Sequence, residues 1–123
     1  MESKVLKKRE EILDQDKWAV HEIYSNDEAW EKEYKELQEE APKLKEFEGK
    51  LGDGETLIKY FEVNEKVSRK AEKIYVYAHL RCDEDTSNTK YQAMMNKIDA
   101  YRLNMQHIQP MLCQKFYLFL MEL

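Results

Sequence analysis

Apolar residues recur along the chain at helical spacing, with charged and polar residues between them. In the first such segment they lie alternately four and three residues apart, which places them on one face of a helix. These positions are Trp30, Tyr34, Leu37, Ala41 and Leu44. Ser25, followed three residues later by Glu28, predicts a capping box at the start of this helix. Pro42 is expected to kink the helix or end its regular part, and Gly49 is expected to stop it.

Two further helices show the same pattern. The second is expected to follow a short loop, residues 49–54, in which Asp53 can cap it, and to run to about Arg81. Its apolar stripe consists of Leu57, Tyr60, Val67, Ala71, Ile74 and Ala78, widened by Phe61, Val63 and Tyr75. Short polar side chains at residues 83–88 favour a break, so a third helix should begin near Asn88 or Thr89. Its stripe consists of Tyr91, Met94, Ile98, Tyr101, Met105, Ile108 and Leu112, with Met95 beside it.

The segment before the first helix shows little periodicity. Residues 1–24 are expected to form an irregular arm that packs through Trp18, Ile23 and Tyr24. Short polar loops between long helices favour antiparallel neighbours. The sequence therefore predicts an all-α fold, an antiparallel up-down-up bundle of about three long helices with an irregular N-terminal arm. The arm occupies residues 1–24 and the helical domain residues 25–123.

Composition agrees with this fold class and narrows the function. The chain has 123 residues, enough for one domain, and its only three glycines lie between positions 49 and 54. So few turn residues argue against a β-sandwich or a Gly-rich phosphate-binding fold. The 20 Lys and Arg are interleaved with 25 Asp and Glu, for a net charge of −5. Because nucleic-acid affinity comes mainly from basic side chains, we expect no nucleic-acid partner.

Cysteine usage and hydropathy bear on the compartment. Cys82 and Cys113 form no C-x-x-C motif and have no His at ligand spacing, which favours reduced thiols in the cytoplasm. No apolar leader segment is evident near the N-terminus. The most apolar stretch, residues 116–121, is far shorter than the ~20 residues that cross a bilayer. We therefore expect a soluble, cytoplasmic chain with no membrane partner.

Two short motifs invite a metal-binding interpretation. His21-Glu22 begins like the zinc-binding H-E-x-x-H motif, but Ser25 stands where the second His is needed. Residues 83–87 begin like a calcium loop, but Asn88 replaces the glycine at its sixth position and Met94 the bidentate Glu at its twelfth. Neither pattern can close a metal site.

The remaining candidate residues favour packing over chemistry. His79 and His107 lie on different predicted helices, and neither belongs to a cluster of acids and thiols. The sequence thus predicts no catalytic, cofactor-binding or metal-binding residue on this chain. One minor alternative is a small-ligand pocket, although Met and Tyr at helical spacing usually form a core. That pocket would be lined by Tyr75, Tyr77, Tyr91, Tyr101, Met94 and Met105.

Three segments together resemble the oligoendopeptidase F proteins, which are zinc metallopeptidases of family M3. The first comprises Lys17-Trp18, Ile23-Tyr24 and residues 27–31 (DEAWE), and the second is Phe47-Glu48-Gly49-Lys50-Leu51. The third and most specific is residues 75–88 (YVYAHLRCDEDTSN), followed by Tyr91-Gln92. Their order and spacing agree with the family over residues 17 to about 109. Ala19, His21 and the residues after Pro110 depart from its pattern.

The resemblance implies an N-terminal helical domain of such a peptidase. Family members hydrolyse short peptides with a zinc-activated water, and their H-E-x-x-H helix and downstream Glu ligand lie in a C-terminal catalytic domain. The resemblance gives no counterpart of these ligands in this sequence. The chain alone is therefore expected to be inactive and to act structurally, lining or restricting the substrate channel. Zinc and the oligopeptide substrate are implied only for the full-length enzyme.

An alternative is a non-enzymatic helical interaction module. A helical piece of a larger enzyme would expose apolar surface meant for the missing catalytic domain, and such patches drive association. The candidate surface is the run that contains Phe116, Leu118, Phe119 and Leu120. The expected partner is then either the missing domain or a second copy of this chain, in a homodimer.

Overall fold

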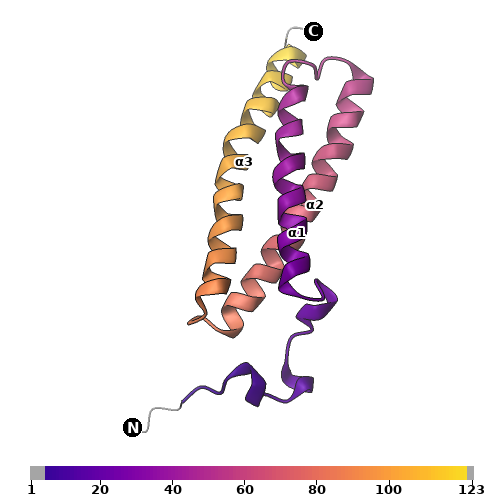
Figure 1. Cartoon of the computed structure of the whole chain (residues 1–123). Helices are drawn as coiled ribbons and strands as arrows, with labels where there is room; N and C mark the ends of the chain where they lie inside the picture. The colour runs from indigo at the N-terminus through magenta and orange to yellow at the C-terminus, as the bar shows by residue number, and fades with distance from the viewer. Residues whose placement is uncertain (1–4, 122–123) are drawn as a thin grey trace.

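The computed structural model describes residues 5–121, and between residues 107 and 120 it describes the helical backbone without the side chains. Its main elements are helices α1 (Asp27–Glu40), α2 (Gly54–Glu84) and α3 (Thr89–Met121). The three run side by side in alternating directions, with the N-terminal arm below one end of the bundle (Figure 1). No strand occurs within residues 5–121. The predicted all-α, up-down-up architecture is confirmed.

The ends of α1 follow local chemistry, with one correction. Asn26, rather than Ser25, caps the helix, because the Asn26 backbone is extended and its side chain accepts a hydrogen bond of 2.8 Å from the Ala29 amide. At the other end α1 stops at Glu40 and tightens into the 3₁₀ segment η4 (Ala41–Phe47). Pro42 stands in the first turn of η4, where its missing amide proton costs nothing. Gly49 then turns the chain with a φ of +75°.

The core forms where the three predicted stripes meet, and residues of the arm and of the loop before α2, such as Val20, Tyr24 and Leu51, complete it. Its largest fully buried side chains are Trp30, Leu37, Leu44, Val67, Ile74, Tyr77, Met94 and Ile98. Trp30 also donates a hydrogen bond of 2.8 Å from Nε1 to the Ile74 carbonyl, which ties α1 to α2. Phe61, predicted to widen the core stripe of α2, is instead 54% exposed, and Tyr77 packs in the core although it was not assigned to that stripe.

The arm consists of short 3₁₀ turns, η1 (Arg9–Glu11), η2 (Asp14–Asp16) and η3 (Val20–Glu22). Tyr24 is buried and Ile23 partly buried, as predicted, but Trp18 is 52% exposed and Val20 is buried in its place. Val20 lies in η3, which packs against α2. The boundary between arm and domain at residue 24 stays a prediction.

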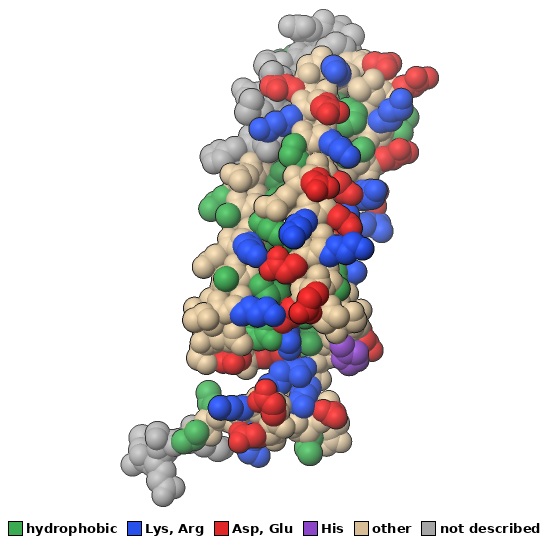
Figure 2. Space-filling model, viewed as in Figure 1, with side chains coloured by type: hydrophobic (Ala, Val, Ile, Leu, Met, Phe, Trp, Pro, Cys, Tyr) green, Lys and Arg blue, Asp and Glu red, His purple; other side chains and the backbone are tan. Residues whose placement is uncertain are grey.

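The exterior carries both signs of charge. On the face seen in Figure 2, basic and acidic side chains alternate over the helices, with apolar side chains in the seams between them. Several pairs join neighbouring helices, including Lys70 with Glu40 at 3.1 Å and Lys97 with Glu31 at 2.8 Å. Such partly exposed pairs contribute little to stability individually. Within the described residues, no helix is both long and apolar enough to span a membrane.

Candidate functional site

A cluster of charged side chains, which we call the polar junction, lies where the arm meets the bundle. It comprises Arg9, Asp27, Tyr77, Arg81, Glu84 and Lys90. Asp27 is its centre: it accepts hydrogen bonds from the Tyr77 hydroxyl at 2.7 Å and from Lys90 Nζ at 2.9 Å. These contacts join the start of α1 to the end of α2 and the start of α3.

The second half of the junction holds the arm. Arg9 Nε donates to Glu84 Oε2 at 2.7 Å, across 75 positions of sequence. Arg81 reaches the same carboxylate oxygen at 3.3 Å and lies 3.7 Å from Asp27. The Arg81 guanidinium also lies 4.7 Å from the centre of the Tyr91 ring, a cation–π distance. The junction is thus a structural network that closes one end of the bundle.

The environment of Asp27 fixes its charge. Burial by itself raises the pKa of this carboxyl group. The hydrogen bonds from Lys90 and Tyr77 and the positive charge of Arg81 outweigh burial, so that the pKa of Asp27 lies below its ordinary value. Asp27 is therefore ionised near neutral pH and accepts hydrogen bonds rather than transferring protons.

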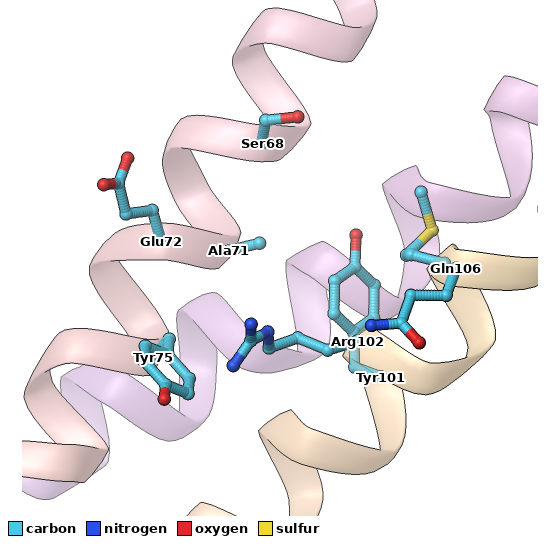
Figure 3. Close-up of a pocket in the computed structure, with 8 residues that line it drawn as sticks. Ser68, Ala71, Glu72, Tyr75, Tyr101, Arg102 and Gln106 are labelled. Atoms are coloured by element: carbon cyan, nitrogen blue, oxygen red, sulfur yellow. The ribbon is translucent and has the colours of Figure 1, made fainter. Parts of the chain in front are cut away.

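A different kind of site lies between the two longest helices. We call it the α2–α3 groove. It has a volume of about 450 Å³. Its lining residues are Ser68, Ala71, Glu72, Tyr75, Tyr101, Arg102, Met105 and Gln106. Figure 3 shows Arg102 reaching from α3 toward Tyr75 on α2. The Arg102 guanidinium carbon lies 4.4 Å from the centre of the Tyr75 ring. A concave surface with apolar and polar walls is typical of a binding site.

A neighbouring cavity of about 630 Å³ lies on the other side of Tyr101 and Met105, against α1 and η4. Gln38, Pro42 and Lys45 contribute to its wall. Tyr101 and Met105 therefore form a partition between two hollows, and burial raises the pKa of Tyr101 to about 12. The Tyr101 hydroxyl is consequently neutral and able to donate a hydrogen bond near neutral pH.

The sequence of this chain is similar to those of known peptidases. The chain is 37% identical over 90 residues to oligopeptidase PepF of Bacillus subtilis (strain 168), a match that covers 72% of this chain and 13% of that protein. It is 37% identical over 93 residues to the group B oligopeptidase PepB of Streptococcus agalactiae, covering 75% and 16%. This chain is homologous to the N-terminal region of the oligoendopeptidase F peptidases.

A third relative matches this chain to a similar degree. Chromosomal oligoendopeptidase F of Lactococcus lactis subsp. cremoris is 35% identical over 103 residues, which is 81% of this chain and 17% of that protein. The chain thus spans less than a fifth of the length of these relatives. No family model matches it, and no solved structure matches it significantly. The resemblance inferred from the three sequence segments is confirmed.

The structure shows what the segments that resemble oligoendopeptidase F do locally. Asp27 comes from the first of them, and Tyr77, Arg81 and Glu84 come from the third. All four belong to the polar junction. The second segment contains Gly49, which makes the positive-φ turn before α2. The first and third segments therefore meet at the polar junction, at one end of the bundle.

The zinc ion implied by the oligoendopeptidase F family finds no fitting ligand set in the described part of this chain. Within residues 5–121, excluding the side chains of 107–120, no three His, Cys, Asp or Glu side chains are grouped to hold a metal ion. His79 lies 3.7 Å from Asp83 and 4.6 Å from the Tyr75 ring centre, in a local pair only. No step of hydrolysis is therefore assigned to these residues.

The calcium-like segment at the end of α2 is also explained by local contacts. Asp85 Oδ1 accepts from the Ser87 hydroxyl at 2.7 Å, which builds a turn before α3. Asp83 faces His79, and Glu84 faces Arg9 and Arg81. The three carboxylates thus have separate partners and do not converge on one cation.

The six small-ligand residues considered from the sequence do not gather at one site, and Tyr91 lies against the Arg81 guanidinium of the polar junction. Tyr77 and Met94 are buried in the core. Tyr75, Tyr101 and Met105 line the α2–α3 groove. Sequence reasoning missed Arg102, because nothing in its own surroundings along the chain marks it; its contact with Tyr75 exists only after α2 and α3 pack. His107, Cys113 and the apolar run at residues 116–121 lie in the stretch for which side chains are not described.

Proposed function

We propose that this helical unit is a structural part of an oligopeptide-hydrolysing zinc peptidase, in which it lines or restricts the substrate channel. The observation that carries the proposal is the 35–37% identity to proteins named oligopeptidase or oligoendopeptidase F over about three quarters of this chain. The chemistry of the described residues is compatible with a supporting role, since several charged pairs join helices, such as Lys70 with Glu40 and Lys90 with Asp27. The proposed compartment is the cytoplasm, where thiols such as Cys82, free in this structure, stay reduced.

A segment swap tests this proposal. The matching segment of the Bacillus subtilis relative is replaced by the aligned residues of this chain, and cleavage of a quenched fluorescent oligopeptide is measured. We expect the chimera to cleave the peptide, and a version with the segment deleted to lose cleavage. We expect this chain alone, incubated with zinc, to show no turnover above a chelator-treated sample, because the described residues present no metal-binding group.

Two results would contradict the proposal. One is a chimera that is helical by circular dichroism and monodisperse but inactive, since the unit then does not replace its relative. The other is zinc-dependent cleavage by this chain alone, which would make it an enzyme rather than a supporting part. A chimera that carries Trp18→Ala, a change at a half-exposed position of the arm, controls for the effect of substitution itself.

A second candidate function is self-association of a non-enzymatic helical module. The observation in its favour is the exposure of large apolar side chains on α2 and α3, namely Ile58 (61%), Phe61 (54%) and Leu103 (60%). Ile58 and Phe61 lie one helical turn apart on the same face of α2. Water-exposed apolar groups of this size gain free energy when a partner covers them.

Static light scattering of the isolated chain measures this association. If the chain self-associates, we expect a dimer, and we expect it to dissociate when Phe61→Ser removes an apolar ring from the surface. The control is Phe47→Ser, at a partly buried position that packs on the core, which should lower stability without a specific effect on dimerisation. A monomer at every concentration up to the solubility limit eliminates the candidate.

A further inference from the structure

The α2–α3 groove offers a set of polar groups whose chemistry matches the end of a peptide. We propose that this groove binds the carboxyl terminus of an oligopeptide, with Arg102 holding the terminal carboxylate. This inference builds on the proposed function, because it names a binding step on the part of the peptidase that this chain supplies.

Arg102 differs from the other arginines of the chain. Arg9 pairs with Glu84, Arg69 with Glu65 at 2.6 Å, and Arg81 with Glu84 at 3.3 Å. For Arg102, no carboxylate among the described residues lies within ion-pair distance, and its guanidinium rests on the Tyr75 ring at 4.4 Å. This cation–π contact holds the guanidinium against the ring, and the edge of the guanidinium remains able to donate N–H groups to a ligand. A planar fork of donors held in this way is suited to a bidentate bond to a carboxylate.

The groups around Arg102 can recognise a peptide unit. The Ser68 hydroxyl, the Tyr101 hydroxyl and the Gln106 amide line the groove beside Arg102. A hydroxyl and a primary amide can each both donate and accept, as the N–H and C=O of the last peptide bond require. Ala71 and Met105 supply apolar wall for the last side chain. The groove therefore holds complements for the carboxylate, the adjacent peptide bond and one side chain.

Charge and size favour a single carboxylate over a phosphate group. Of the described residues that line the groove, Arg102 is the one cation, and Glu72, the one acid among them, forms no ion pair with it. In Figure 3 the Glu72 carboxylate points away from Arg102 and Tyr101, so the guanidinium remains open. A dianionic phosphate would be repelled by Glu72 and would have one cation to neutralise it, whereas a carboxylate is matched by one guanidinium. The volume of about 450 Å³ is that of a small-ligand site.

The test compares one peptide in two forms. A hexapeptide of apolar and small residues, without acidic side chains, is prepared with a free carboxyl terminus and as its terminal amide. Binding to the full chain is followed by amide chemical shifts in two-dimensional NMR. We expect the free acid to bind about tenfold or more tightly than the amide, because a charge-assisted bidentate pair is lost in the amide. Shifted resonances should map to Tyr75, Tyr101 and Gln106.

Substitutions at two arginines separate the groove from general electrostatics. We expect Arg102→Gln to abolish the preference for the free acid and Arg102→Lys to restore it only in part. The matched control is Arg69→Gln, which removes the same charge from an exposed, paired position outside the groove lining. Unchanged circular dichroism shows that each variant is folded.

Three outcomes would overturn the proposal. They are equal binding of the acid and the amide, no binding of either at millimolar peptide, and equal loss of binding in the Arg69 and Arg102 variants. An amidated peptide with one internal Glu identifies the source of the carboxylate; if it binds as well as the free acid, the groove does not select a carboxyl terminus. None of these measurements depends on hydrolysis, so the segment swap can succeed while this test fails, and the reverse.

Discussion

Replacing Trp30 by Ala should destabilise the bundle by about 3–5 kcal/mol, the range seen for truncation of large buried aromatic side chains. Trp30 has no exposed surface, and its ring stacks on Tyr34 with ring centres 5.4 Å apart. The substitution also removes the hydrogen bond of 2.8 Å that Trp30 donates to the Ile74 carbonyl on α2. A cavity and the loss of a hydrogen bond between two helices both lower the stability of the folded state.

Urea unfolding followed by far-ultraviolet circular dichroism measures this loss. The midpoint and slope of the transition give the free energy of unfolding. The chain provides its own control, because its only other tryptophan, Trp18, is 52% exposed on the arm. Trp18→Ala should change the free energy of unfolding by no more than about 0.5 kcal/mol. Equal effects of the two substitutions would show that Trp30 is not the centre of the core.

The two tryptophans also show which buried positions the sequence predicts correctly and which it does not. Trp30 was placed in the core because it begins a regular series of apolar positions, and a period of 3.6 residues is a strong signal over a helix of 14 residues. Trp18 belongs to no such series. Its expected packing depended on its size alone, and the structure exposes it and buries Val20 instead. Periodicity is thus informative where the helix is long and uninformative in the arm.

On α2 the predicted apolar stripe exists, but the residues at its edges differ from the prediction. Tyr77 lies three residues after Ile74 and one before Ala78, so its burial follows from the helical period and could have been predicted. Phe61 directly follows Tyr60 and points about 100° further round the helix, outside the face that meets α1 and η4. Hydrophobicity alone does not decide whether a flank position is covered.

The candidate sites were less accessible to sequence reasoning than the core. Asp27 stands in the first turn of α1, where an acidic residue is favourable, yet its main partners, Tyr77 and Lys90, are 50 and 63 positions away. Arg102 and Tyr75 come from facing helices as well. Polar contacts between distant segments leave no periodic trace in a single sequence, whereas the resemblance to oligoendopeptidase F did mark the segments that meet at the polar junction.

Replacing Asp27 by Asn should cost about 2 kcal/mol near neutral pH, a value within the range for hydrogen bonds to a charged group. The Asp27 side chain is 13% exposed and faces Arg81, which is 18% exposed. Asn retains an oxygen for the Tyr77 hydroxyl but no charge to balance Arg81. Lys90 is 56% exposed and should contribute little to this loss. Urea unfolding of Asp27→Asn gives the number, and Asp99→Asn, at an exposed position of α3, is the matched control.

The pH dependence of the same pair of proteins tests the cause. Because the pKa of Asp27 is lower in the folded chain than its ordinary value of 3.8, its contribution is fully present above that value. As pH falls through 3.8 toward the lower folded pKa, the carboxylate is protonated and the contribution is lost. The difference in unfolding free energy between wild type and Asp27→Asn should therefore be smaller at about pH 3 than near neutral pH. A difference that stays constant down to that pH would mean that the shape of the side chain, not its charge, closes the bundle.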